Sequence, residues 1–172
     1  MRFFIALCLS LGLITTSAFA QNFPSFVSQD LNGDTHSLPA DFPGDPTIVF
    51  IAYKRDQQPD VDSWVSALNL DPDIGPEFVE LPVVGSLTRL ISPVVDNGMR
   101  SGIVNTSLRA RTITLYENAS KVNTPLGFDG RDDIRVLLVR PTGEVIWKTS
   151  GPATSQGVDD LKAIYAQSLK KP

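Results

Sequence analysis

Residues 47–70 constrain the fold of this 172-residue chain more strongly than any other stretch. Residues 47–53 are a continuous apolar run, which predicts a buried strand. A polar segment, residues 54–58, follows. Beyond Pro59, apolar residues recur at the i, i+3, i+4, i+7 spacing of an amphipathic helix: Val61, Trp64, Val65 and Leu68. Pro59 suits the first helical turn because its missing N–H has no intrahelical acceptor there. The stretch therefore predicts a buried strand, a polar loop and a helix.

The first twenty residues have the composition of a secretory signal peptide. Arg2 supplies the positive end, residues 3–14 are apolar, and Ala18-Phe19-Ala20 is a small-x-small cleavage site before Gln21. The apolar run is shorter than the about 20 residues that span a membrane, although a short uncleaved anchor is the alternative. We expect export, to the periplasm of a Gram-negative host and otherwise to the medium. Residues 21–172 should form one domain that does not insert into the membrane after cleavage.

Cysteine usage and charge exclude several classes of function. The only cysteine is Cys8, within the predicted signal, so residues 21–172 offer no disulfide, thiolate nucleophile or thiolate metal ligand. Thiol oxidoreductase or peroxidase activity is therefore not expected. The formal net charge is −4, or −5 once Arg2 is removed, and no basic cluster stands out. A nucleic-acid or anionic-membrane partner is not expected for such a chain.

The remaining patterns predict an alternation of strands and helices. Asn32-Gly33, between residues 26–31 and 35–38, predicts a hairpin with a type I′ turn. Residues 78–84 predict a strand, which Pro82 places near a sheet edge or at a bulge. Pro93 should kink or split the helix predicted over residues 87–95. Strands are predicted at residues 112–116, 134–139 and 145–148, and a last helix at residues 158–169.

This order resembles the thioredoxin-like fold of exported thioredoxins and peroxiredoxins. The likeness rests on residues 30–34 with Leu38, on the strand, loop and helix of residues 48–64, and on residues 136–147. It implies an α/β three-layer sandwich, with a central mixed sheet flanked by helices and an N-terminal β-hairpin. Redox members carry a nucleophilic cysteine where this chain has residues 56–59, and a cis-proline before the strand that here begins at Ile134. Both are missing, so we expect a non-redox relative.

A finer resemblance points to one group of non-redox relatives. Residues 61–64 after a cysteine-free loop, and residues 134–147 followed by residues 150–153, are similar to the mitochondrial ATP synthase assembly factor family. That family is thioredoxin-like, lacks the redox pair and is thought to act as a chaperone on a membrane subunit. The resemblance implies a protein-binding role as an assembly factor or chaperone, with a membrane-complex subunit as a candidate partner. The export signal differs from a mitochondrial address.

The loop after the first long strand is the best candidate binding site. In this fold it lies beside a helix N-terminus and can present backbone donors to an anion or a partner peptide, although a solvated turn is the plain alternative. The candidate residues are Tyr53, Lys54, Arg55, Asp56 and Gln57, with Arg131 and Asp132 expected across the site. An enzyme of a different class would use Arg55, Asp56 and Arg131 on an anionic substrate, by thiol-independent chemistry.

Metal and acid–base sites have weaker support in the sequence. His36 is the only histidine, which leaves carboxylates as the main metal ligands. Residues 30–34 resemble the start of a calcium loop, but they lack the later bidentate glutamate and also fit the hairpin turn. The paired aspartates at positions 71/73, 132/133 and 159/160 lie in loops or at a helix start, where carboxylates are usually solvated or capping. No metal and no cofactor are expected.

Overall fold

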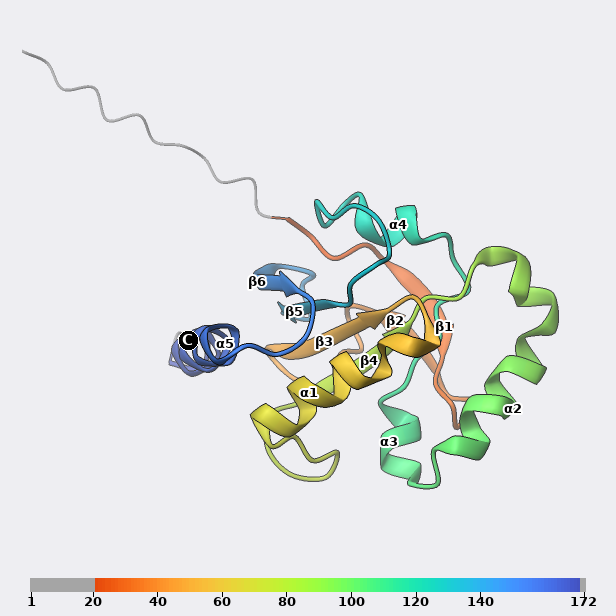
Figure 1. Ribbon diagram of the computed structural model, residues 1–172, viewed down its shortest axis with the longest axis horizontal. Helices are drawn as coiled ribbons and strands as arrows, with labels where there is room; N and C mark the ends of the chain where they lie inside the picture. Colours follow the sequence, from red (N-terminus) through yellow and green to blue (C-terminus); the bar gives the residue numbers. More distant parts are fainter. Residues whose placement is uncertain (1–20, 171–172) are drawn as a thin grey trace, which may run out of the picture.

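The computed structural model describes residues 21–170, so the predicted signal peptide lies outside the described residues. A four-stranded sheet has the order β4-β3-β5-β6. Strands β3 (Thr47–Ala52) and β4 (Phe78–Pro82) are parallel, whereas β5 (Arg135–Val139) runs antiparallel to both β3 and β6 (Val145–Ser150). The mixed sheet and its flanking helices confirm the predicted thioredoxin-like α/β class (Figure 1).

Helices α1 (Gln58–Leu68) and α5 (Ser155–Ser168) pack on one face of the sheet. Trp64 of α1 is buried, and its Nε1 donates to the Gly151 carbonyl at 3.0 Å. Its ring meets that of Trp147 edge-on, with the centroids 6.1 Å apart. The alternate residues of β3 and β5 that face this layer are apolar, namely Ile48, Phe50, Val136 and Leu138. Because the intervening residues of β3 are buried on the opposite face, the whole apolar run of this strand is accounted for.

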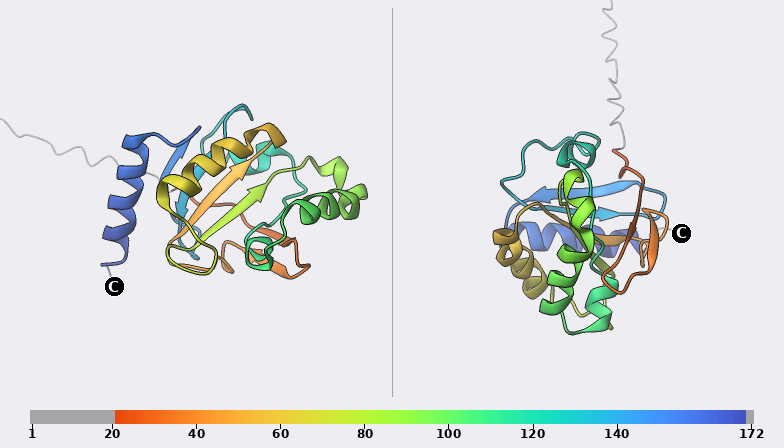
Figure 2. Two further views of the ribbon diagram at one scale, coloured as in Figure 1. Left: turned by 60° about the horizontal axis from the view of Figure 1, so that its bottom comes forward. Right: turned by 90° about the vertical axis from the view of Figure 1, so that its right-hand side faces the viewer.

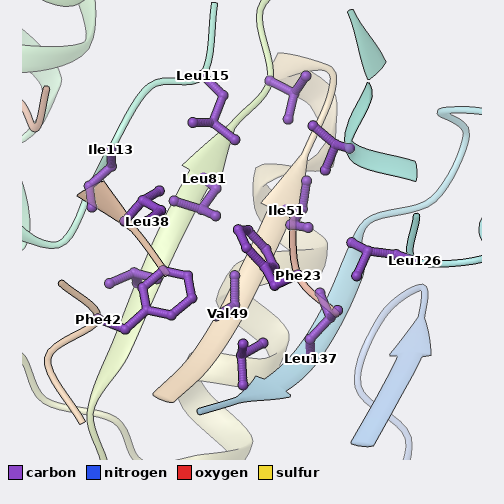
Figure 3. Packing of buried hydrophobic residues seen from close by; sticks show 14 residues of the cluster. Phe23, Leu38, Phe42, Val49, Ile51, Leu81, Ile113, Leu115, Leu126 and Leu137 are labelled. Atoms are coloured by element: carbon purple, nitrogen blue, oxygen red, sulfur yellow. The ribbon is translucent and has the colours of Figure 1, made fainter. Parts of the chain in front are cut away.

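The opposite face is covered by the N-terminal segment, by the hairpin of β1 (Phe26–Gln29) and β2 (Thr35–Leu38), and by the short helix α4 (Ala119–Asn123). Figure 3 shows Phe23, Phe42 and Leu126 packed over the apolar side chains of the strands. The strand residues beneath them are Val49, Ile51, Leu81 and Leu137. Three layers result, as the resemblance implied.

The N-terminal hairpin forms as predicted, but its turn is different. Gln29 pairs with Thr35, so five residues connect the strands, and among them only Gly33 has a positive φ, of 100°. The buried Asp30 carboxylate organises the connection: its Oδ1 accepts from the backbone N–H groups of Asn32, Gly33 and Asp34 at 2.8–3.0 Å. The type I′ prediction was wrong because this side chain supplies the acceptor for a wider turn. The carboxylate has the role of a turn acceptor rather than of a calcium ligand.

Residues 112–116, predicted as a strand, run parallel to β4 and pair at only two isolated bridges, one with Glu80 of β4 and one with Val83 just beyond it. The Ile113 N–H donates to the Glu80 carbonyl at 2.9 Å, and the Leu115 N–H to the Pro82 carbonyl at 2.8 Å. Between these bonds a parallel ladder needs the N–H of residue 82, which proline lacks. Pro82 therefore interrupts the ladder on the outer side of β4, in agreement with its predicted place near a sheet edge.

Pro93 splits the helix predicted over residues 87–95. A 3₁₀ helix, η2 (Ser86–Ile91), is followed by α2 (Ser92–Gly102), and Pro93 lies in the first turn of α2. The short α3 (Thr106–Ala110) then leads back to residues 112–116. Helices α2 and α5 lie at opposite ends of the domain (Figures 1 and 2). Among residues 21–170, no helix combines the length and apolar character needed to cross a membrane.

Two helical glycines allow a matched test of this packing. A Cβ at Gly157 of α5 would lie 2.9 Å from Trp64 Cη2, whereas a Cβ at Gly98 of α2 would meet nothing within 4 Å. We expect Gly157→Ala to destabilise the domain by about 1–3 kcal/mol through overpacking. Gly98→Ala should stabilise it by roughly 0.5–1 kcal/mol, because alanine loses less backbone entropy in a helix. Urea unfolding measures both, and a stabilised Gly157→Ala variant would contradict the packing of α5 on α1.

Candidate binding site

Gln57 fixes the loop between β3 and α1. Its side chain is only 4% exposed, at the end of the 3₁₀ helix η1 (Arg55–Gln57). Its Oε1 accepts from the backbone N–H of Tyr53 at 2.8 Å and of Lys54 at 3.2 Å, and its Nε2 donates to the Arg131 carbonyl at 2.8 Å. One buried amide thus ties the loop both to itself and to a segment 74 residues away. Gln57, predicted as a contact residue, therefore lies beneath the loop and positions it.

An ion pair joins the same two segments at the surface. Lys54 Nζ lies 2.8 Å from Asp132 Oδ1, and both side chains are exposed. This hydrogen bond, together with the positive charge of Lys54, holds the pKa of Asp132 below its ordinary value. Such an exposed pair adds little stability. It does show that the structure brings Lys54 and Gln57 together with Arg131 and Asp132, as the sequence predicted.

Three of the predicted site residues present free charges to solvent. Arg55 and Asp56 lie on the exposed side of η1, and Arg131 is exposed on the facing segment. Within residues 21–170, the side chains of these three residues make no hydrogen bond or ion pair to the protein. Because Gln57, Lys54 and Asp132 are already paired, Arg55, Asp56 and Arg131 are the predicted site residues whose charges remain available to a ligand or partner.

A buried polar cluster beside the loop was not predicted from the sequence. The Tyr53 hydroxyl donates to Asn123 Oδ1, and Asn123 Nδ2 donates to the Gly130 carbonyl at 2.7 Å. Arg135, only 4% exposed, lies with its guanidinium carbon 4.8 Å from the Phe128 ring centroid and 5.9 Å from that of Tyr53. Its Nη2 donates to the Asp129 carbonyl at 2.6 Å, while its Nε has no partner among the described residues. The sequence feature that could have revealed this cluster is Arg135, the single charged residue in the otherwise apolar strand β5.

This cluster stabilises the loop rather than supplying an acid or base. Burial raises the pKa of Tyr53 to about 12, so its hydroxyl stays protonated at neutral pH. The one carboxyl near the start of α1 whose pKa is raised by burial is Glu80, and Gln58 Nε2 lies 3.5 Å from its Oε2. Cavities of about 480 and 310 Å³ lie elsewhere, the first beside α5 and the second beside His36 and Arg111. The geometry at the loop therefore favours surface binding.

Comparison with solved structures supports the fold. The Sco protein BsSco, described as a member of a family of cytochrome c oxidase assembly proteins, is 14% identical, with a TM-score of 0.57 over 89% of this chain and 96% of its own. A thiol:disulfide interchange protein from Chlorobium tepidum is 18% identical, with a TM-score of 0.53 over 90% and 99%. One from a Bacteroides species is 17% identical, with a TM-score of 0.51 over 85% and 89%.

These likenesses establish a thioredoxin-like fold, and at such low identity they establish the fold alone. No family model matches the sequence, and no curated protein matches it. The neighbours are named for thiol:disulfide exchange or for a disulfide switch, whereas residues 21–172 of this chain contain no cysteine. What the chain shares with them is therefore the scaffold, and its function has to be argued from its own loop.

Gln57→Ala tests whether the buried amide holds the loop. The substitution leaves two N–H groups and one carbonyl without their partner, and we expect a loss of about 2–4 kcal/mol in the free energy of unfolding. Gln167→Ala is the control, since Gln167 is exposed on α5 and should change stability by less than about 0.5 kcal/mol. Urea titration distinguishes the two. Equal effects would mean that Gln57 does not position the loop.

Proposed function

We propose that this chain is an exported, non-redox thioredoxin-like protein that binds a protein partner, as an assembly factor or chaperone. The observation that carries the proposal is that a buried glutamine, Gln57, holds the loop after β3. Redox members of this fold need a thiolate in this loop, whereas here the buried Gln57 fixes the loop with three hydrogen bonds. The loop is thereby fixed, and the free charges of Arg55, Asp56 and Arg131 face outward.

A fixed loop suits recognition, because a surface that is ordered before binding loses less entropy when it binds. The two free arginines favour a partner segment that carries carboxylates, since a guanidinium forms bidentate pairs with them. Asp56 adds a single acceptor beside them. Arg55, Asp56 and Arg131 would then form the contact surface, with Lys54 and Asp132 at its edge and Gln57 beneath.

Two likenesses support an assembly role in particular. BsSco belongs to a family of cytochrome c oxidase assembly proteins, and residues 61–64 and 134–147 of this chain resemble the mitochondrial ATP synthase assembly factor family. Both point to the maturation of membrane complexes, so the candidate partner is a membrane-complex subunit that exposes an acidic segment to the exported protein.

A crosslinking pull-down from the native host tests the proposal. The tagged chain is compared with an Arg55→Ala/Arg131→Ala variant and with a Lys162→Ala/Lys170→Ala control, which removes the same charge from the distant helix α5 and its end. We expect one defined partner to be recovered with the wild type and the control and lost with the loop variant. With the purified partner, the loop variant should bind at least about tenfold more weakly. Equal recovery with all three would refute the proposal.

A further inference from the structure

An apolar strip on η2 and α2 is left uncovered by the rest of the domain. Leu87 is 88% exposed, Leu90 91%, Ile91 53% and Val94 71%. These four residues, here called the apolar strip, follow one another along the two helices at the end of the domain opposite α5 (Figure 2). Isolated exposed apolar residues are ordinary, whereas four within residues 87–94 form an apolar patch of the kind that is often functional.

The charged side chains of the same segment are hydrogen-bonded within the domain, although Arg89 is itself 62% exposed. Arg89 Nη2 lies 3.3 Å from both the Tyr116 carbonyl and Glu117 Oε1. Asp96 Oδ1 accepts from the Tyr116 hydroxyl at 2.6 Å. Arg100 donates from Nε to the Leu31 carbonyl. Because each of these charged groups already has a hydrogen-bond partner within the domain, covering the strip would bury no charged group that lacks a hydrogen bond.

The strip is also complementary to itself. Its residues occupy positions i, i+3, i+4 and i+7, a pattern that is symmetric about the midpoint between Leu90 and Ile91. When two such strips meet antiparallel across a two-fold axis at the junction of η2 and α2, the Leu87 end of each strip lies against the Val94 end of the other. A two-fold interface requires this reciprocity, in which residue i contacts residue j and j contacts i.

The exposed area agrees with the size of a dimer interface. The four side chains expose roughly 500 Å² of apolar surface between them, and a stable interface covers roughly 800 Å² on each partner, of which about 60% is apolar. An anionic membrane surface is a poorer match, because membrane-surface helices carry several outward-facing lysines and arginines beside their apolar face. Here Arg89 is 62% exposed, whereas Arg100 is half-buried and donates to the Leu31 carbonyl.

We propose that the apolar strip is the interface of a two-fold symmetric homodimer, in which η2 and α2 of two copies pack antiparallel. The strip contains none of the residues of the loop after β3. The dimer is therefore independent of the proposed partner binding, and it would present two copies of the loop to a membrane complex. The failure of either proposal leaves the other standing.

The position of the only cysteine allows a direct test. In protein recovered after export and carrying Cys8→Ser, no native cysteine competes with an introduced one. Leu90→Cys lies next to the proposed axis and should form a disulfide-linked dimer under mild oxidation at low micromolar concentration. Ile74→Cys is the matched control, since Ile74 is 76% exposed in a loop outside the strip, and it should stay mainly monomeric. Equal crosslinking of both variants, or none at position 90, would overturn the proposal.

Light scattering of the unmodified protein provides a second measurement. The wild type and Ile74→Asp should be dimers at micromolar concentration, whereas Leu90→Asp should be a monomer with an unchanged circular dichroism spectrum. A wild type that stays monomeric up to about 100 µM overturns the homodimer. Two other results would also overturn the homodimer. One is a monomeric wild type that co-floats with vesicles of phosphatidylcholine and phosphatidylglycerol, and the other is a monomeric wild type that binds a different protein through Leu90.

Discussion

The candidate site depends on one buried amide. Gln57 lies in the loop between β3 and α1, and its three hydrogen bonds join the end of β3, the start of η1 and the segment around Arg131. A buried donor or acceptor that loses its partner costs more than an ordinary hydrogen bond contributes, so these bonds are mutually dependent. Within residues 21–170, the only other side-chain hydrogen bond or ion pair between residues 54–57 and residues 131–132 is the Lys54–Asp132 pair, which is exposed.

The sheet explains why a loop at this position is so well ordered. Strand β3 pairs with β4 on one side and β5 on the other, and its residues from Thr47 to Ile51 are buried. The loop leaves the end of this central strand and turns directly into α1, which Trp64 fastens to the sheet. At the base of the loop, the Tyr53 hydroxyl donates to Asn123 of α4, and the Arg135 guanidinium lies over the Tyr53 ring. The rigid scaffold thus fixes both ends of a short polar segment.

Local patterns were sufficient to predict most of the fold. The apolar run at residues 47–53, the helical spacing after Pro59 and the interruptions at Pro82 and Pro93 each reflect a constraint that acts within a few residues, and each was confirmed. The role of Gln57 and the burial of Arg135 were not predictable, because their partners lie across the fold or depend on the packing of Phe128.

The apolar strip shows a second limit. Its spacing is that of a helix packed on a core, and sequence alone cannot distinguish a surface that faces the same domain from one that faces another molecule.

Amide hydrogen exchange at Tyr53 and Lys54 tests the central claim most directly. If the buried Gln57 amide holds the loop, both N–H groups exchange only when the domain opens extensively, and their protection approaches that of the β3 core. Exchange at both positions as fast as in the exposed residues of η1, while β3 stays protected, would mean that the loop opens freely. The account of a closed, ordered binding surface would then be wrong.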